Sequence, residues 1–128
     1  MRQTQRQFIE LLPVLFHVNH PILPGYVSKT TPAGIPSYSV SASSINRLKK
    51  HFKSFEFKKR AYHKFEILAI YLMGSSGSIA YSKQSDFDIW LCHVSNLNAN
   101  QIDELKNKAR AVENWAKDLG VEANIYLV

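Results

Sequence analysis

Two carboxylates stand one residue apart at the start of an apolar run in the second half of the chain. Asp86 and Asp88 flank Phe87, and the apolar run continues through residues 89–92. Side chains of a strand alternate between its two faces, so we expect both carboxylates to project from the same face. Mg²⁺ prefers hard oxygen ligands and is commonly held by one or two carboxylates together with the phosphates of a substrate. Asp86 and Asp88 are therefore predicted metal ligands.

A turn rich in glycine and serine precedes these carboxylates. The apolar run of residues 67–73 ends at Gly74, and Ser75 and Ser76 follow directly. At the start of a helix, free N–H groups and hydroxyls can bind a phosphate, and glycine lets the phosphate approach the backbone closely. Lys83, between the turn and the carboxylates, is a further candidate for phosphate binding. A metal end and a phosphate end in one site predict chemistry on a nucleoside triphosphate.

The order of these motifs resembles the nucleotidyltransferase superfamily of DNA polymerase β, in which a Gly-Ser turn is followed by Asp-x-Asp on the next strand. Further segments narrow the resemblance to the class I adenylate cyclases of the enterobacterial type. These segments are Leu-Leu-Pro at 11–13, His-Pro…Pro-Gly-Tyr at 20–26, Glu-Asn-Trp-Ala at 113–116 and Leu-Gly-Val-Glu at 119–122. The resemblance extends over residues 8–128 and is weakest over residues 39–66.

The resemblance implies an activity, a cofactor and partners. It implies conversion of ATP to cyclic AMP and pyrophosphate, with two Mg²⁺ ions held by Asp86 and Asp88. One ion would steady the triphosphate, and the other would lower the pKa of the ribose 3′-hydroxyl for attack on the α-phosphorus. The resemblance places substrate binding at the Gly-Ser turn, Gly74 and Ser75, and the residues themselves add Ser76 and Lys83 as candidates. Family members are several times longer and carry a regulatory region, so we expect this chain to be a fragment completed by the rest of a cyclase chain.

A third carboxylate is expected on the third strand in this superfamily, and Glu122 is the acid of this chain that could supply it. Glu122 could bind the metal, or it could act as general base for the 3′-hydroxyl. It could equally be a solvent-facing residue at the start of a strand. The third acid could also lie beyond Val128.

Two other functions are compatible with parts of the sequence. A minimal nucleotidyltransferase, which moves a nucleotide onto a protein, RNA or small-molecule hydroxyl, would use the same metal and phosphate groups. A module that binds nucleic acid without catalysis would use a cluster of eight basic residues instead. This cluster consists of Arg47, Lys49, Lys50, Lys53, Lys58, Lys59, Arg60 and Lys64. No residue pattern in the sequence indicates which nucleotide base the protein prefers.

Composition limits the class of protein. The 128 residues fit one domain, and a hydrophobic content of 45% allows a modest core. The formal net charge of +6 suits polyanionic ligands such as nucleotides. A single cysteine, Cys92, excludes an internal disulfide framework and is typical of a reducing compartment. We find no signal peptide and no apolar run long enough to span a bilayer, so we expect a cytoplasmic protein.

Hydrophobic periodicity predicts the elements that position the site. We expect helices over residues 5–16, 45–55 and 75–81, and a long helix that begins after Asn98 or Asn100 and ends at residue 118. We expect strands over residues 66–73, 86–92 and 121–128. Pro13 should kink or end the first helix. Ser43 or Ser44 should cap the second helix, Asn98 or Asn100 should cap the long one, and Gly120 should end it.

These elements predict an α/β fold with a small mixed sheet in the order β-α-β-α-β. N-terminal helices and a long Pro/Gly-rich loop over residues 20–44 precede the sheet. The resemblance implies a nucleotidyltransferase-like version of this fold with the site at one strand edge. We expect residues 1–128 to form one domain, the N-terminal part of a catalytic domain. Residues 1–65 would be a lead-in of helices and loop, and residues 66–128 would be the core.

Overall fold

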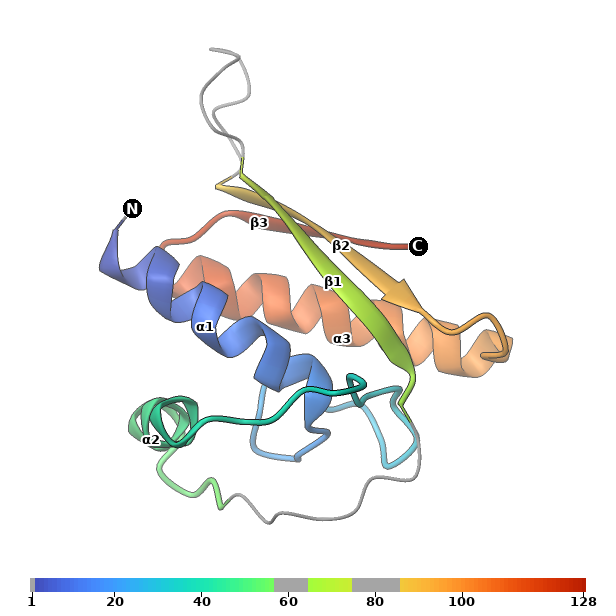
Figure 1. The fold of residues 1–128 in the computed structure, drawn as a ribbon, viewed down its shortest axis with the longest axis horizontal. Helices are drawn as coiled ribbons and strands as arrows, with labels where there is room; N and C mark the ends of the chain where they lie inside the picture. Colours follow the sequence, from blue (N-terminus) through green and yellow to red (C-terminus); the bar gives the residue numbers. More distant parts are fainter. Residues whose placement is uncertain (1, 57–64, 75–85) are drawn as a thin grey trace.

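The molecule contains a three-stranded mixed sheet with helices packed on one of its two faces (Figure 1). The computed structural model describes residues 2–56, 65–74 and 86–128. The elements are α1 (Gln3–His17), α2 (Ala42–His51), β1 (Ile67–Gly74), β2 (Phe87–His93), α3 (Ala99–Asp118) and β3 (Ala123–Leu127). The predicted mixed α/β architecture with a small sheet is therefore confirmed. The predicted helix at 75–81 lies outside the described residues.

Strand β2 is the middle strand and carries the Asp-Phe-Asp motif into the sheet. It pairs antiparallel with β1 and parallel with β3. The register places Asp88 opposite Met73 on one side and opposite Asn124 on the other. Phe87, Ile89 and Leu91 alternate with these positions and are buried. One face of β2 thus belongs to the core, and Asp88 belongs to the other face.

Helices α1 and α3 cover the buried face of the sheet (Figure 1). Phe8 of α1 is fully buried, and its ring stacks on Phe87 with 6.3 Å between ring centroids. The same ring lies 6.1 Å from that of Trp115 on α3. Burial of large aromatic side chains contributes strongly to the stability of a domain of this size. The Phe8–Phe87 contact holds β2 against the helices, one residue away from Asp88.

The sequence predicted that Pro13 would kink or end the first helix, but α1 does not end there. It continues through Pro13 to His17, although the proline removes one backbone hydrogen bond. The residues on both sides of Pro13 explain why, because Leu12 and Val14 are almost fully buried. Their burial offsets the lost hydrogen bond.

Among the described residues, no helix is both long and apolar enough to cross a bilayer.

Helix α2 begins earlier than predicted, because Ser41 rather than Ser43 or Ser44 is its cap. The Ser41 hydroxyl accepts a hydrogen bond from the Ser44 amide at 3.1 Å, which is the geometry that an N-cap requires. The helix also ends at His51, four residues before the predicted limit of 55.

The ends of α3 follow the prediction closely. Asn98 caps the helix and forms a reciprocal capping box with Gln101. Gly120 follows the helix with φ of 78°, a left-handed conformation that glycine adopts without strain. The chain then turns directly into β3, which runs parallel to β2. This turn brings Glu122 back to the start of β2.

Candidate functional site

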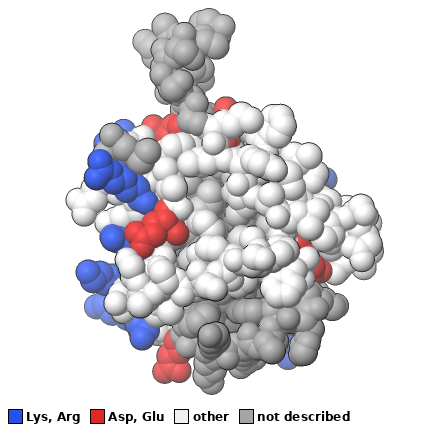
Figure 2. Space-filling model, viewed as in Figure 1, with Lys and Arg blue, Asp and Glu red and all other residues white. Residues whose placement is uncertain are grey.

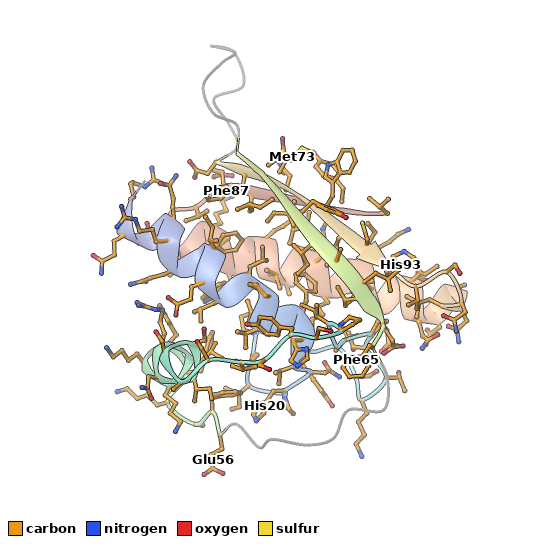
Figure 3. All side chains as sticks on the ribbon, in the orientation of Figure 1. His20, Glu56, Phe65, Met73, Phe87 and His93 are labelled. Carbon is orange, nitrogen blue, oxygen red and sulfur yellow. The ribbon has the colours of Figure 1, made fainter. Side chains whose placement is uncertain are left out.

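Asp88 occupies the open face of the sheet near the end of β2 where that strand begins. Its side chain is partly buried between the neighbouring strands. The Asn124 amide donates a long hydrogen bond of 3.5 Å to Asp88 Oδ1. Met73 and Phe87, which flank Asp88 in register and in sequence, lie at the same end of the sheet in Figure 3. Asp88 is thus a carboxylate on a rigid strand with one amide beside it.

Asp86 is held differently, because it lies one residue before β2. Its Oδ1 accepts a hydrogen bond from Gln5 Nε2 at 3.0 Å. Its Oδ2 accepts one from the Glu122 amide at 2.9 Å and lies 3.3 Å from the guanidinium of Arg2. Strand alternation therefore does not determine the direction of the Asp86 side chain. Its carboxylate links the start of β2 to the residues at the start of α1 and to the residue before β3.

Glu122 precedes β3 directly and stands across from Asp86. Its carbonyl accepts hydrogen bonds from the amides of Asp86 and Phe87, at 2.7 and 3.1 Å. With the bond from its own amide to Asp86, these contacts fix the backbone of Glu122 firmly. Its side chain is exposed. The Glu122 carboxylate is thus solvent-accessible, on a backbone that is held beside Asp86.

Gly74 is the last residue of β1 and pairs with Phe87. The register thus brings the first residue of the Gly-Ser motif next to the Asp-Phe-Asp motif, although ten or more residues separate the two in sequence. Ser75, Ser76 and Lys83, the other predicted substrate-binding residues, lie outside the described residues.

The donors at this end of the sheet are oxygens, which suit Mg²⁺ or Mn²⁺ and not zinc. Within residues 2–56, 65–74 and 86–128, no group of three or more Asp, Glu, His or Cys side chains could hold a metal ion. The described residues therefore provide one or two carboxylates and an amide. Mg²⁺ accepts such an incomplete protein shell, because waters and substrate phosphates fill its remaining positions.

Basic side chains gather along one edge of the molecule in Figure 2, on the side where α1 begins and α2 lies. Arg47 of α2 is partly neutralised by Glu10 of α1, with 3.0 Å between the charged groups. Lys49, Lys50 and Lys53 are exposed. The remaining members of the predicted basic cluster, Lys58, Lys59, Arg60 and Lys64, lie outside the described residues.

Three residues at this end of the sheet were not predicted as site residues. Gln5 of α1 and Arg2, the residue before α1, contact Asp86 from more than 80 residues away in sequence, and no local pattern indicates such a contact. Asn124 follows Glu122 by two residues, and alternation along the predicted strand over residues 121–128 put both on one face, which was the one available signal.

Comparison with known proteins identifies close relatives over this same segment. Residues 1–128 match the family model described as the adenylate cyclase NT domain. An adenylate cyclase from Escherichia coli K12 is 35% identical over 126 residues, and one from Pasteurella multocida is 36% identical over 125 residues. The alignments cover 96% and 93% of this chain. An adenylate cyclase from Proteus mirabilis is 34% identical over the whole chain.

The chain spans 15% of the length of these curated relatives. No solved structure matches the chain. The family that the sequence motifs resemble is confirmed by the match over residues 1–128 and by the named relatives. The chain therefore belongs to the adenylate cyclase NT domain family.

Proposed function

We propose that this chain is the N-terminal part of the nucleotidyltransferase-like catalytic domain of an adenylate cyclase. The enzyme would convert ATP to cyclic AMP and pyrophosphate with Mg²⁺. The observation that carries the proposal is the register of β1 with β2, which sets Gly74 against Phe87 and Met73 against Asp88. A phosphate-binding turn and a metal-binding carboxylate would then meet at one end of one sheet.

Asp88 is the proposed principal metal ligand, with the Asn124 side chain orienting its carboxylate. When bound, Mg²⁺ would neutralise the triphosphate and make the ribose 3′-hydroxyl more acidic. Asp86 is the proposed second ligand. The Arg2 guanidinium beside Asp86 is a cation that a metal would replace. The Arg2 side chain is 58% exposed, and it would have to give up its hydrogen bond of 2.8 Å to the Gly120 carbonyl to make room.

The reaction would form a bond from the 3′-oxygen to the α-phosphorus and break the bond from the α-phosphorus to the bridging oxygen of pyrophosphate. The 3′-hydroxyl proton must leave as this happens. Glu122 is the proposed acceptor of that proton or a third ligand, because its exposed carboxylate extends from a backbone fixed beside Asp86. Ser75, Ser76 and Lys83 are proposed to bind the phosphates.

Calorimetric titration of ATP into the chain, with and without Mg²⁺, tests this proposal. We expect binding that requires Mg²⁺ and that weakens at least about tenfold in Asp88→Asn, because a charged ligand is lost. Asp86→Asn should also reduce the Mg²⁺-dependent part of the binding. Asp103→Asn, a change of the same kind on the exposed surface of α3, should leave binding unchanged.

Urea unfolding of each variant shows whether it is folded before its binding is compared. Equal Mg²⁺-dependent binding by the native chain and Asp88→Asn would contradict the assignment of Asp88. A folded native chain that binds no ATP would contradict the placement of the substrate site in this segment.

A further inference from the structure

Three aromatic side chains form a continuous row across the open face of the sheet. The register pairs Tyr71 of β1 with Trp90 of β2, and Trp90 with Tyr126 of β3. The three side chains are 57%, 44% and 50% exposed. Large aromatic groups in such numbers on one uncovered strand row mark a binding surface more often than a chance arrangement.

This row is the immediate neighbour of the proposed metal site. Asp88 precedes Trp90 by two residues, and Asn124 precedes Tyr126 by two, so the carboxylate and the aromatic row share one face. Two residues along a strand span about 7 Å. From the end of the sheet inward, the order is therefore Gly74, the Asp88 row and the aromatic row.

The chemical order of a nucleotide is the same. Phosphates come first, one ribose follows, and the base is an aromatic ring system at the other end. A base stacks on exposed aromatic side chains without needing a specific hydrogen-bond pattern. This explains how the chain could hold a base although no residue pattern in the sequence identifies one. The next row on this face, with Ala69 opposite Cys92, carries no charge that would attract a different group.

We propose that the row Tyr71–Trp90–Tyr126 is the platform on which the adenine base of the substrate stacks while its phosphates lie at Asp88. This inference rests on the proposed function and adds the position of the base to it. The occupant is set by continuity with the Asp88 site, because a ligand anchored there by phosphates extends over the neighbouring row. An alternative occupant, a polypeptide segment covering an apolar face, would not respond to the base of a ligand.

Comparing ATP with inorganic tripolyphosphate isolates the contribution of the nucleoside, and the aromatic variants then test how much of it comes from stacking of the base. Both bring a Mg²⁺-bound triphosphate, and tripolyphosphate has neither base nor ribose. In calorimetric titrations with Mg²⁺, we expect the native chain to bind ATP about tenfold more tightly than tripolyphosphate. The double variant Trp90→Leu/Tyr126→Leu should lose most of this preference and bind tripolyphosphate as the native chain does.

Phe65→Leu is the matched control, because Phe65 is 43% exposed and lies at the opposite end of β1 from Met73 in Figure 3. It should keep the native preference for ATP. Titration of adenosine against the fluorescence of Trp90, read as the difference between the native chain and Trp90→Leu, should show quenching in the native chain only.

Equal affinities of the native chain for ATP and tripolyphosphate would overturn the platform, and so would a preference that survives in the double variant. Asp88→Asn separates this failure from that of the proposed function, because it should weaken the binding of both ligands. If Asp88→Asn weakens the binding of both ligands and the native chain shows no preference for ATP over tripolyphosphate, only the base platform is wrong. If the folded native chain binds neither ligand, both proposals are wrong.

Discussion

Replacing Lys108 with methionine should stabilise the chain at neutral pH and remove most of the rise in stability between pH 7 and pH 10. Lys108 lies on α3 with a side chain only 1% exposed, and burial lowers its pKa to about 7. Its Nζ lies 5.7 Å from the centre of the Phe16 ring. No described carboxylate lies within ion-pair distance of it. A charge in this position is poorly compensated.

The direction of the pH effect follows from proton binding. In the unfolded chain Lys108 has a pKa of about 10.4. Between this value and the folded value near 7, the unfolded chain binds more protons. The free energy of unfolding of the native chain should therefore rise with pH across this window, by roughly 3–5 kcal/mol from this group. Methionine has a similar length, no charge and an adaptable shape, so it should avoid the cost.

Urea unfolding of native chain and Lys108→Met at pH 7, 8.5 and 10 measures the effect as the difference between the two. Other titrating groups change both proteins alike and cancel. Lys106→Met, an exposed change on the same helix, should leave the pH dependence native. Parallel pH profiles for native chain and Lys108→Met would show that the buried amine does not titrate in this range.

Phe8→Ala should lower the free energy of unfolding by about 3–5 kcal/mol, the usual cost of removing a fully buried aromatic side chain. Phe8 contacts Phe87 and Trp115, so the loss would separate α1, β2 and α3 at one point. Domains of this size are stable by about 5–15 kcal/mol, so a large fraction of the margin would disappear. The remaining protein would also hold Asp88 less rigidly, because Phe87 precedes it.

The midpoint and slope of urea denaturation measure this loss. Phe8→Leu should recover part of the stability, since it refills most of the volume. Phe65→Ala removes a ring that is 43% exposed and should cost less than about 1 kcal/mol. A loss of the same small size in Phe8→Ala would mean that α1 is not an integral part of the core.

The elements of the fold could be predicted because their signals are local. Apolar alternation on β2, the cap at Asn98 and the glycine at 120 each act within a few residues. The observed end of a helix differed from the predicted one where several local signals competed. At the start of α2, Ser41 caps the helix instead of the later serines, Ser43 and Ser44. The continuation of α1 beyond Pro13 depends on burial against the rest of the molecule, which a local pattern does not contain.

The candidate site was predictable only in part, for the same reason. Strand alternation applies to Asp88, because Asp88 lies inside β2 and points away from the buried Phe87 and Ile89. Asp86 lies before the strand, and its orientation is decided by Arg2, Gln5 and the Glu122 amide. The aromatic row depends on the pairing of β1, β2 and β3, and register between strands far apart in sequence is a tertiary property.

Paramagnetic broadening by Mn²⁺ tests the central proposal, a metal-bound triphosphate at Asp88, most directly. Mn²⁺ takes the same oxygen ligands as Mg²⁺ and broadens NMR signals of nearby nuclei. With ATP and a small amount of Mn²⁺ added to the ¹⁵N-labelled chain, we expect the amide signals of Met73, Asp88 and Asn124 to broaden first, and Asp88→Asn to abolish this. Broadening that begins elsewhere, or that persists unchanged in Asp88→Asn, would contradict a metal site at Asp88.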